Sequence, residues 1–255
     1  MTRQRLGERL APFLLPLLLL AVWQATAGGF VARNVLPSPV AVAEAFAKLA
    51  GNGQLAEHLS VSVGRALSGF AVGGLVGFAL GLANGLSRRS ETVLDTSVQM
   101  IRNIPHLALI PLVIVWFGIG EEAKLFLVAL GVFFPVYVNT FHGIRSVDPQ
   151  LVEMARVYGV SRLELFARVV FPGALPSILV GVRYALGIMW LTLIVAETIS
   201  ASSGLGYMAM QAREFMQLDV VILAILIYAL LGKLADSLVR IVERAALSWH
   251  PGYRR

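Results

Sequence analysis

Long uncharged runs dominate the chain and predict helices that cross a membrane. A hydrocarbon core of about 30 Å needs roughly 20 apolar helical residues. Four runs reach or approach this length without a charge, and they cover residues 10–32, 66–87, 103–120 and 125–144. A fifth run, about 174–196, is interrupted by Arg183, and a sixth, about 215–235, carries Asp219 and Lys233 near its ends. We therefore expect an all-α polytopic membrane bundle with six transmembrane helices.

The composition favours a membrane protein over a soluble one. Apolar residues make up 57% of the chain and charged residues 14%, against roughly 45–50% and about 25% in soluble domains. The chain has no cysteine, which excludes disulfides, thiolate metal sites and cysteine nucleophiles. The histidines show no metal-binding spacing, so we expect no metal site. The net charge is +6, but the arginines lie between apolar runs, so we expect no nucleic-acid binding.

The basic residues predict the orientation in the membrane. Most of the 21 Lys and Arg residues fall in alternate connections between the runs. These residues are Arg3, Arg5, Arg9, Arg88, Arg89, Arg102, Arg145, Arg156, Arg162, Arg168, Arg240, Arg244, Arg254 and Arg255. Basic residues concentrate on the cytoplasmic side of membrane proteins, so we expect both termini in the cytoplasm.

The first apolar run has an alternative interpretation. Basic residues up to Arg9, the apolar stretch 11–23 and Ala25-Thr26-Ala27 together resemble a cleavable signal peptide. Its removal would leave five spans in the same orientation, so the charge pattern does not decide whether the segment is retained.

Glycine recurs at every fourth position of the second run, which places a strip without side chains along one helix face. The positions are Gly69, Gly73, Gly77, Gly81 and Gly85. Such a strip allows another backbone to approach closely. We favour packing within the chain over a subunit interface. No repeat, low-complexity tract or linker divides the sequence, so residues 1–255 are expected to form a single transmembrane domain.

Two segments outside the spans carry helix-capping signals. In Leu36-Pro37-Ser38-Pro39, Ser38 is expected to cap a short helix that starts at Pro39 and ends at Gly51-Asn52-Gly53. In the longest inside connection, Asp148 and Pro149 are expected to open a helix that runs to Tyr158 and stops at Gly159.

A second short helix is expected directly after that glycine. Ser161 and Glu164 have the spacing of a capping box, and Phe171-Pro172-Gly173 is expected to end the helix. Leu163 and Phe166 are three positions apart and should give it an apolar edge. The sequence thus predicts a helix, a glycine turn, a second helix and a proline break beneath the membrane, in a segment of about 145–173.

The same segment resembles the EAA loop of ABC importer permeases. The resemblance rests on Glu153-Met154-Ala155, on Gly159 and on Val169-Val170-Phe171-Pro172. It implies that the segment docks into a groove on an ATPase subunit, with Glu153, Ala155 and Gly159 shaping the loop. Residues 160–166 would make most of the contact. The contact residues implied are Ser161, Arg162, Leu163, Glu164 and Phe166, and Arg162 and Glu164 would set the orientation.

The resemblance extends over nearly the whole chain to the permeases of nitrate, sulfonate and taurine ABC importers, and among these to those for aliphatic sulfonates. It is carried by residues 36–39, 101–111, 152–156, 171–177 and 190–201. It implies a type I importer fold in the bacterial inner membrane and uptake of an aliphatic sulfonate, with nitrate, taurine or another small anion as the alternative. The implied partners are a second copy, two ATPase subunits that bind ATP and Mg²⁺, and a periplasmic or lipid-anchored substrate-binding protein.

Four polar residues are candidates for the substrate pathway. Arg183 lies well inside the fifth run, where a charge is costly and often functional. It is expected either to contact a passing anion or to extend its side chain to the inner head groups. Asn103 and His106 flank a proline, where a kinked helix would expose backbone groups, although a lone histidine is more often structural. Glu197 ends the fifth run and is expected to pair with Arg65 or Arg213.

Two other classes of function fit the sequence less well. An intramembrane enzyme such as a lipid phosphatase would need polar residues gathered at one membrane face, and a passive channel would need a charged ring or filter segment. Neither pattern is present. The phosphate-binding motif G-x-x-x-x-G-K-[ST] is also missing, so we expect no enzymatic activity and no cofactor in this chain.

Overall fold

The computed structural model describes the backbone of residues 2–29 and 36–249, and the side chains of 14–27, 36–199 and 201–249. All elements of the described backbone are helical, as predicted. They are α1 (Thr2–Gly29), α2 (Pro39–Gly51), α3 (Gln54–Leu86), α4 (Arg88–Arg102), the 3₁₀ turn η1 (His106–Leu109), α5 (Ile110–Phe117), α6 (Glu121–Arg145), α7 (Pro149–Val157), α8 (Arg162–Leu165), the π-helical turn η2 (Phe166–Val170), α9 (Phe171–Ser200), α10 (Leu205–Glu214) and α11 (Leu218–Ala246).

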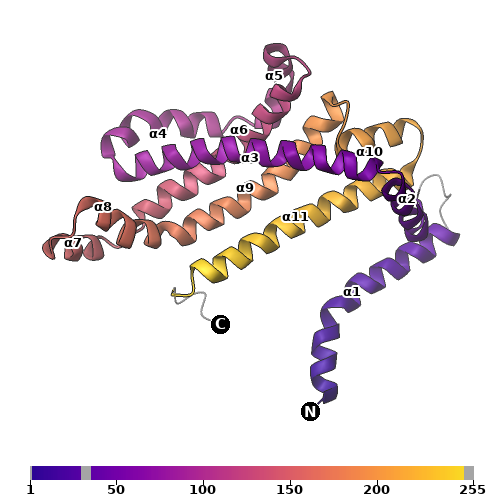
Figure 1. The fold of residues 1–255 in the computed structure, drawn as a ribbon, viewed down its shortest axis with the longest axis horizontal. Coiled ribbons are helices and arrows are strands. Elements are labelled where there is room, and N and C mark those ends of the chain that lie inside the picture. Colours follow the sequence, from indigo (N-terminus) through magenta and orange to yellow (C-terminus); the bar gives the residue numbers. More distant parts are fainter. Residues whose placement is uncertain (1, 30–35, 250–255) are drawn as a thin grey trace.

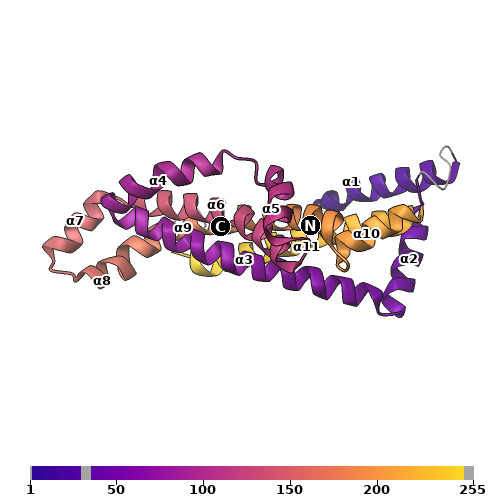
Figure 2. The same cartoon turned by 90° about the horizontal axis from the view of Figure 1, so that it is seen from above.

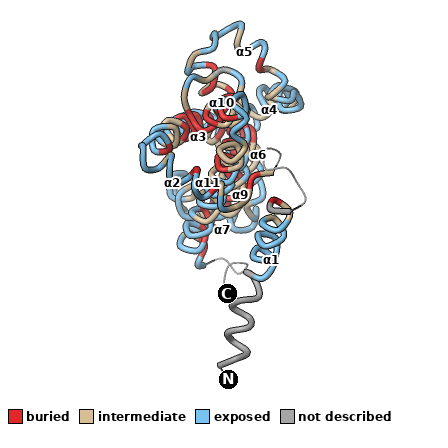
Figure 3. The backbone as a smooth tube through the Cα atoms, turned by 90° about the vertical axis from the view of Figure 1, so that its right-hand side faces the viewer, coloured by how far each residue is buried: buried red, intermediate tan, exposed pale blue. Residues whose placement is uncertain are grey.

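The long helices α3, α6 and α9 form the centre of an elongated bundle, and α11 lies beside α9 (Figure 1). The first three share a buried apolar cluster that includes Ala66 of α3, Val132 of α6 and Met189 of α9. In the end-on view, the buried positions gather in this centre and the peripheral helices are mostly exposed (Figure 3). The core therefore forms where three long apolar helices meet.

The glycine strip of α3 packs against α6. A Cβ atom built at Gly77 would lie 2.6 Å from the carbonyl oxygen of Phe133, and one at Gly85 would lie 2.8 Å from Cβ of Ile144. No side chain fits at such distances, so glycine is what permits this approach. The strip is thus used within the chain, which confirms the favoured interpretation.

The two ends of the bundle are built differently. Helices α7 and α8 protrude at one end, and α2 and α10 lie at the other (Figures 1 and 2). As predicted, the Ser38 side chain caps α2 by accepting a hydrogen bond from the Ala41 amide, and Pro39 occupies the first turn. Helix α1 meets this end of the molecule through Trp23, whose indole donates to the Pro37 carbonyl.

The number of spans differs from the simple count of uncharged runs. In the described chain, α3, α6, α11 and the continuous helix Arg162–Ile199 are long and apolar enough to cross a membrane. A fifth span results if α4 and the helical segment His106–Phe117, which meet at 80°, are one broken span. Only residues 14–27 of α1 have described side chains, and Arg3, Arg5, Arg9, Arg33, Arg254 and Arg255 lie outside that part. The count of six therefore stays a prediction.

The expected third span, residues 103–120, is not a single helix. The chain turns sharply after α4, because Pro105 cannot donate a backbone hydrogen bond and keeps an extended conformation. Helix α5 then projects from the bundle (Figure 1). Arg102 ends α4, and its expected place in an inside connection stays a prediction. Counting uncharged residues finds the apolar segment but not the bend within it.

The predicted proline break at Phe171-Pro172-Gly173 is also wrong. Helix α8 passes through η2 directly into α9. Pro172 lies in the first turn of α9, where its missing amide proton leaves few hydrogen bonds unmade. The residues before it form the π-helical turn η2, which keeps the helix continuous. The coupling segment, which we define as residues 145–173, is therefore continuous with the long central helix α9.

Candidate functional site

Helix α7 has the two caps that the sequence predicts. The Asp148 carboxylate accepts a hydrogen bond from the Gln150 amide at 2.8 Å. At the other end, the Gly159 amide donates to Arg156 and the Val160 amide to Ala155, which is the paired pattern of a Schellman motif. Gly159 has φ +71°, a left-handed conformation that costs other residues energy. The direction in which the chain leaves α7 is thus fixed locally.

Helix α8 starts with the predicted capping box. The Ser161 hydroxyl accepts from the Glu164 amide, and the Glu164 carboxylate accepts from the Ser161 amide. Leu163 is exposed, whereas Phe166 is partly buried and packs beside the core cluster of Ile144 and Val170. These two residues therefore do not form the common apolar edge that we expected.

The turn between α7 and α8 presents apolar side chains to the exterior. We call Val157, Tyr158 and Leu163 the apolar tip; each exposes more than three quarters of its surface, with Tyr158 at 80% and Leu163 at 77%. Glu153, Ser161, Arg162 and Glu164 are also exposed, whereas Ala155 is buried. Val157 and Tyr158 were not among the predicted contact residues, because the expected contact surface began at residue 160.

A buried carboxylate organises the opposite end of the bundle. Glu197 of α9 is 1% exposed and receives hydrogen bonds from side chains of two other helices and from the backbone of a third. The donors are the Ser62 hydroxyl of α3 at 2.8 Å, the Arg65 guanidinium of α3 at 2.8 Å and the Tyr228 hydroxyl of α11 at 2.9 Å. The Gly206 amide of α10 donates at 2.9 Å. Glu197 therefore joins α3, α9, α10 and α11.

The arginine in this cluster extends the charge network. Arg65 is 6% exposed and binds the Glu121 carboxylate with two nitrogens, at 2.5 and 2.6 Å. Glu121 also accepts from the buried Lys124 at 3.0 Å. The prediction that Glu197 pairs with Arg65 or Arg213 is confirmed for Arg65. Charges that are paired and hydrogen-bonded in this way hold helices together, and we call Arg65, Glu121, Lys124 and Glu197 the ion cluster.

Arg183 has two acidic partners that were not predicted from the sequence. Its guanidinium forms ion pairs with Glu243 and, at 3.4 Å, with Asp236, both on α11. The side chain is 35% exposed. Its charge is thus compensated by two carboxylates between α9 and α11. A role in the substrate pathway stays a prediction, and the contacts themselves join two helices.

His106 and Asn103 lie at the bend between α4 and the segment His106–Phe117. His106 Nε2 is 3.0 Å from the Thr192 hydroxyl, which links η1 to the last third of α9. Asn103 follows α4 as its C-terminal cap residue and is exposed. The structure therefore does not gather Asn103, His106, Arg183 and Glu197 into one site. It places them at three separate locations.

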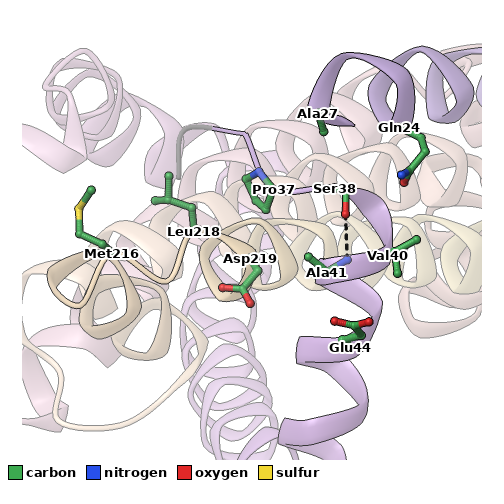
Figure 4. A pocket seen from close by; sticks show the side chains of 10 residues that line it. All are labelled: Gln24, Ala27, Pro37, Ser38, Val40, Ala41, Glu44, Met216, Leu218 and Asp219. Atoms are coloured by element: carbon green, nitrogen blue, oxygen red, sulfur yellow. Dashed lines mark hydrogen bonds between the residues drawn. The ribbon is translucent and has the colours of Figure 1, made fainter. Parts of the chain in front are cut away.

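A cavity of about 510 Å³ lies between α1, α2 and the start of α11 (Figure 4). Its polar side chains include the carboxylates of Glu44 and Asp219, and none of the described residues that line it is a lysine or an arginine. The described part of the lining therefore offers two negative charges and no cation to an anionic ligand.

Comparison with known proteins shows close relatives over almost the full length. The chain is 61% identical, over 96% of its length and 94% of the relative, to a protein of Escherichia coli named as aliphatic sulfonates transport permease SsuC. It is 48% identical to a Bacillus subtilis protein of the same name, over 94% and 87% of the two chains. It is 37% identical to the taurine transport system permease protein TauC of Escherichia coli, over 91% and 86%.

Solved structures show the same fold at lower identity. A subunit of an amino acid ABC transporter superposes with a TM-score of 0.62 at 20% identity, over 78% of this chain and 97% of that one. A chain of an inward-facing methionine ABC transporter gives 0.53 at 21% identity, over 72% and 96%. Residues 60–247 match the family described as binding-protein-dependent transport system inner membrane component. This chain belongs to that family, the inner-membrane permeases of ABC importers.

Proposed function

We propose that this chain is the permease subunit of an ATP-driven importer of aliphatic sulfonates. The observation that carries the substrate class is the 61% identity to the relative named for aliphatic sulfonates transport. Taurine is the second candidate, supported by the weaker 37% identity to the taurine permease. In this proposal two copies of the chain form the pathway, and a periplasmic or lipid-anchored binding protein delivers the anion.

The proposed energy source is a pair of separate ATPase subunits, each with bound ATP and Mg²⁺. The support in this chain is the apolar tip, because large apolar residues exposed together at the end of a bundle commonly mark a contact with another protein. Glu153, Ser161, Arg162 and Glu164 surround it with polar groups, as at the rim of many interfaces. We place this end, and both termini, in the cytoplasm on the basis of the arginine distribution.

The mechanism follows from the continuity of the coupling segment with α9. Closure of the ATPase subunits would move the apolar tip, and the uninterrupted helix Arg162–Ile199 would carry that movement through the bundle. The far end of this helix holds Glu197, which is bonded to α3, α10 and α11. A movement at the tip would therefore shift several helices together and bias the bundle between inward-open and outward-open states.

The test is reconstitution in proteoliposomes with an ATPase subunit and a binding protein of an aliphatic sulfonate importer. We expect ATP-dependent uptake of butanesulfonate only when all three components are present, and no ATP hydrolysis by this chain alone. Taurine and nitrate are assayed in parallel. If the complex imports taurine or nitrate but not butanesulfonate, the proposed substrate is wrong. If the isolated chain hydrolyses ATP, the proposal that separate subunits hydrolyse it is wrong.

A further inference from the structure

A second cavity, of about 340 Å³, lies at the break of the third span. It is lined by Arg102 at the end of α4, by His106 of η1, by residues of α6 that include Phe134, Val138 and Asn139, and by Tyr184 and Ile188 of α9. It thus combines one cation and three uncharged polar groups with apolar side chains. None of the described residues that line it is an aspartate or a glutamate.

The cavity lies at the middle of the bundle. Gly131, which also lines it, follows the first residue of α6 by ten positions and precedes the last by 14. At 1.5 Å per residue these intervals correspond to about 15 Å and about 21 Å. Transporters commonly bind their substrates near the membrane midplane at interrupted helices. The bend between α4 and η1 is such an interruption.

Gly131 makes room for the polar groups. A Cβ atom at this position would lie 3.0 Å from the Thr192 hydroxyl and 3.3 Å from His106 Nε2, so a larger residue would push the histidine away. Asn139 uses one amide proton for the Pro135 carbonyl and has a second one to donate. His106 contacts Thr192 through one ring nitrogen, which leaves the other for a ligand.

Arg102, whose side chain is exposed, differs in charge balance from three arginines that pair with glutamates across helices of the bundle. Arg65, Arg145 and Arg183 each form an ion pair with a glutamate. Arg102 forms no ion pair with any residue that the structure describes. Its guanidinium offers several coplanar N–H donors, a geometry that matches the oxygens of an oxyanion. An anion in the cavity would supply the missing negative charge.

We propose that this cavity holds the alkanesulfonate during its passage, with the sulfonate at Arg102 and the alkyl chain against Phe134, Val138 and Ile188. This inference rests on the proposed function and specifies where its substrate contacts the permease. The apolar lining favours a substrate with an alkyl tail over nitrate. The lack of a carboxylate leaves the ammonium group of taurine without a partner, so the cavity selects butanesulfonate over taurine.

The natural lack of cysteine permits a direct test in the complex with the ATPase. A single cysteine replaces Ile188, and a separate variant carries it at Val138 in case the first does not fold. The thiol is modified with an anionic reagent, sulfonatoethyl methanethiosulfonate, and with a cationic one, trimethylammonioethyl methanethiosulfonate. The ratio of the two rates reports the electrostatic potential in the cavity.

We expect Arg102→Gln to lower the anionic-to-cationic ratio on the order of tenfold, because a cation in a cleft concentrates anions to that extent. Arg102→Lys should retain most of the ratio. Arg89→Gln is the control, since Arg89 is an exposed cation on the same helix. Butanesulfonate should slow the anionic modification more than taurine does at equal concentration.

The results separate this inference from the proposed function. An unchanged ratio in Arg102→Gln, or equal protection by the two sulfonates, overturns the inference even if the complex imports butanesulfonate. A complex that imports no butanesulfonate contradicts the proposed function, whatever the ratio. Uptake by Arg102→Gln at the rate of Arg89→Gln would also overturn the inference, because the guanidinium would then be dispensable.

Discussion

The two ends of the continuous helix Arg162–Ile199 differ in how their side chains are covered. Glu197 is 1% exposed and accepts hydrogen bonds from Ser62, Arg65 and Tyr228. Leu163, at the other end, is 77% exposed and belongs to none of the core clusters of the described chain. In the ion cluster at the first end, each charged side chain is paired with an opposite charge of the chain. At the second, apolar surface is left in contact with solvent. Because the charges of the ion cluster are paired within the chain, we infer a structural role for them. Because the apolar side chains of the tip are exposed, we infer that another protein covers them.

The largest expected effect is at the ion cluster. Glu197→Ala would leave the buried Arg65 with one acidic partner and remove an acceptor from Ser62 and Tyr228. Loss of one member of a buried pair costs about 3–5 kcal/mol. We expect a lower unfolding temperature of the purified chain in detergent, with a smaller decrease for Glu197→Gln. The control is Glu214→Ala at an exposed glutamate of α10. Equal unfolding temperatures for Glu197→Ala and this control would contradict the structural role.

A second effect should appear at the apolar tip without loss of stability. Leu163→Asp places a charge at the centre of the proposed contact, where a substitution at a key position costs about 2 kcal/mol or more. We expect ATPase binding to weaken by about 30-fold and uptake to fall, with an unchanged unfolding temperature of the permease alone. Tyr158→Asp should act in the same way. If both variants bind the ATPase normally, the tip is not a contact surface.

A smaller effect is expected at the turn between α7 and α8. Nothing lies within 4 Å of a Cβ atom at Gly159, so only its left-handed backbone resists substitution. That conformation costs about 1–2 kcal/mol for most residues. Gly159→Val should therefore reorient the tip and reduce uptake, whereas Gly159→Asn should retain most of it, because asparagine tolerates this conformation. Equal uptake by the two variants would show that the conformation of the turn does not matter.

Local signals predicted the ends of helices well. The caps at Ser38, Asp148 and Ser161 and the stop at Gly159 were correct, because each depends on residues within a few positions. The glycine strip of α3 was also assigned correctly, because its spacing places all five glycines on one face. These features require no knowledge of the tertiary structure.

Features that depend on distant contacts were predicted less well. Arg65 was proposed as a partner of Glu197, but Ser62, Gly206 and Tyr228 were not, since nothing local brings three other helices to α9. The acidic partners of Arg183 were missed because the expected sixth span ended at Ala235, one residue before Asp236. The bend at Pro105 was suspected as a kink, yet its size depends on how α5 packs against α6.

The position of Arg102 shows the same limit. Its sequence neighbourhood resembles the basic edge of a cytoplasmic connection, so Arg102 was counted among the arginines that predict the orientation in the membrane. The structure places it in a cavity with His106 and Asn139. Only the folded chain reveals that its charge has no acidic partner among the described residues.

The central claim is that the apolar tip contacts the ATPase subunit, and photo-crosslinking tests it most directly. A benzophenone is attached to a single cysteine in Leu163→Cys, or in the control Val40→Cys, which is exposed at the opposite end of the molecule. After irradiation of the assembled complex, we predict a covalent adduct with the ATPase from Leu163→Cys and none from Val40→Cys. Failure of the Leu163→Cys complex to yield an ATPase adduct while it still imports substrate would contradict the account.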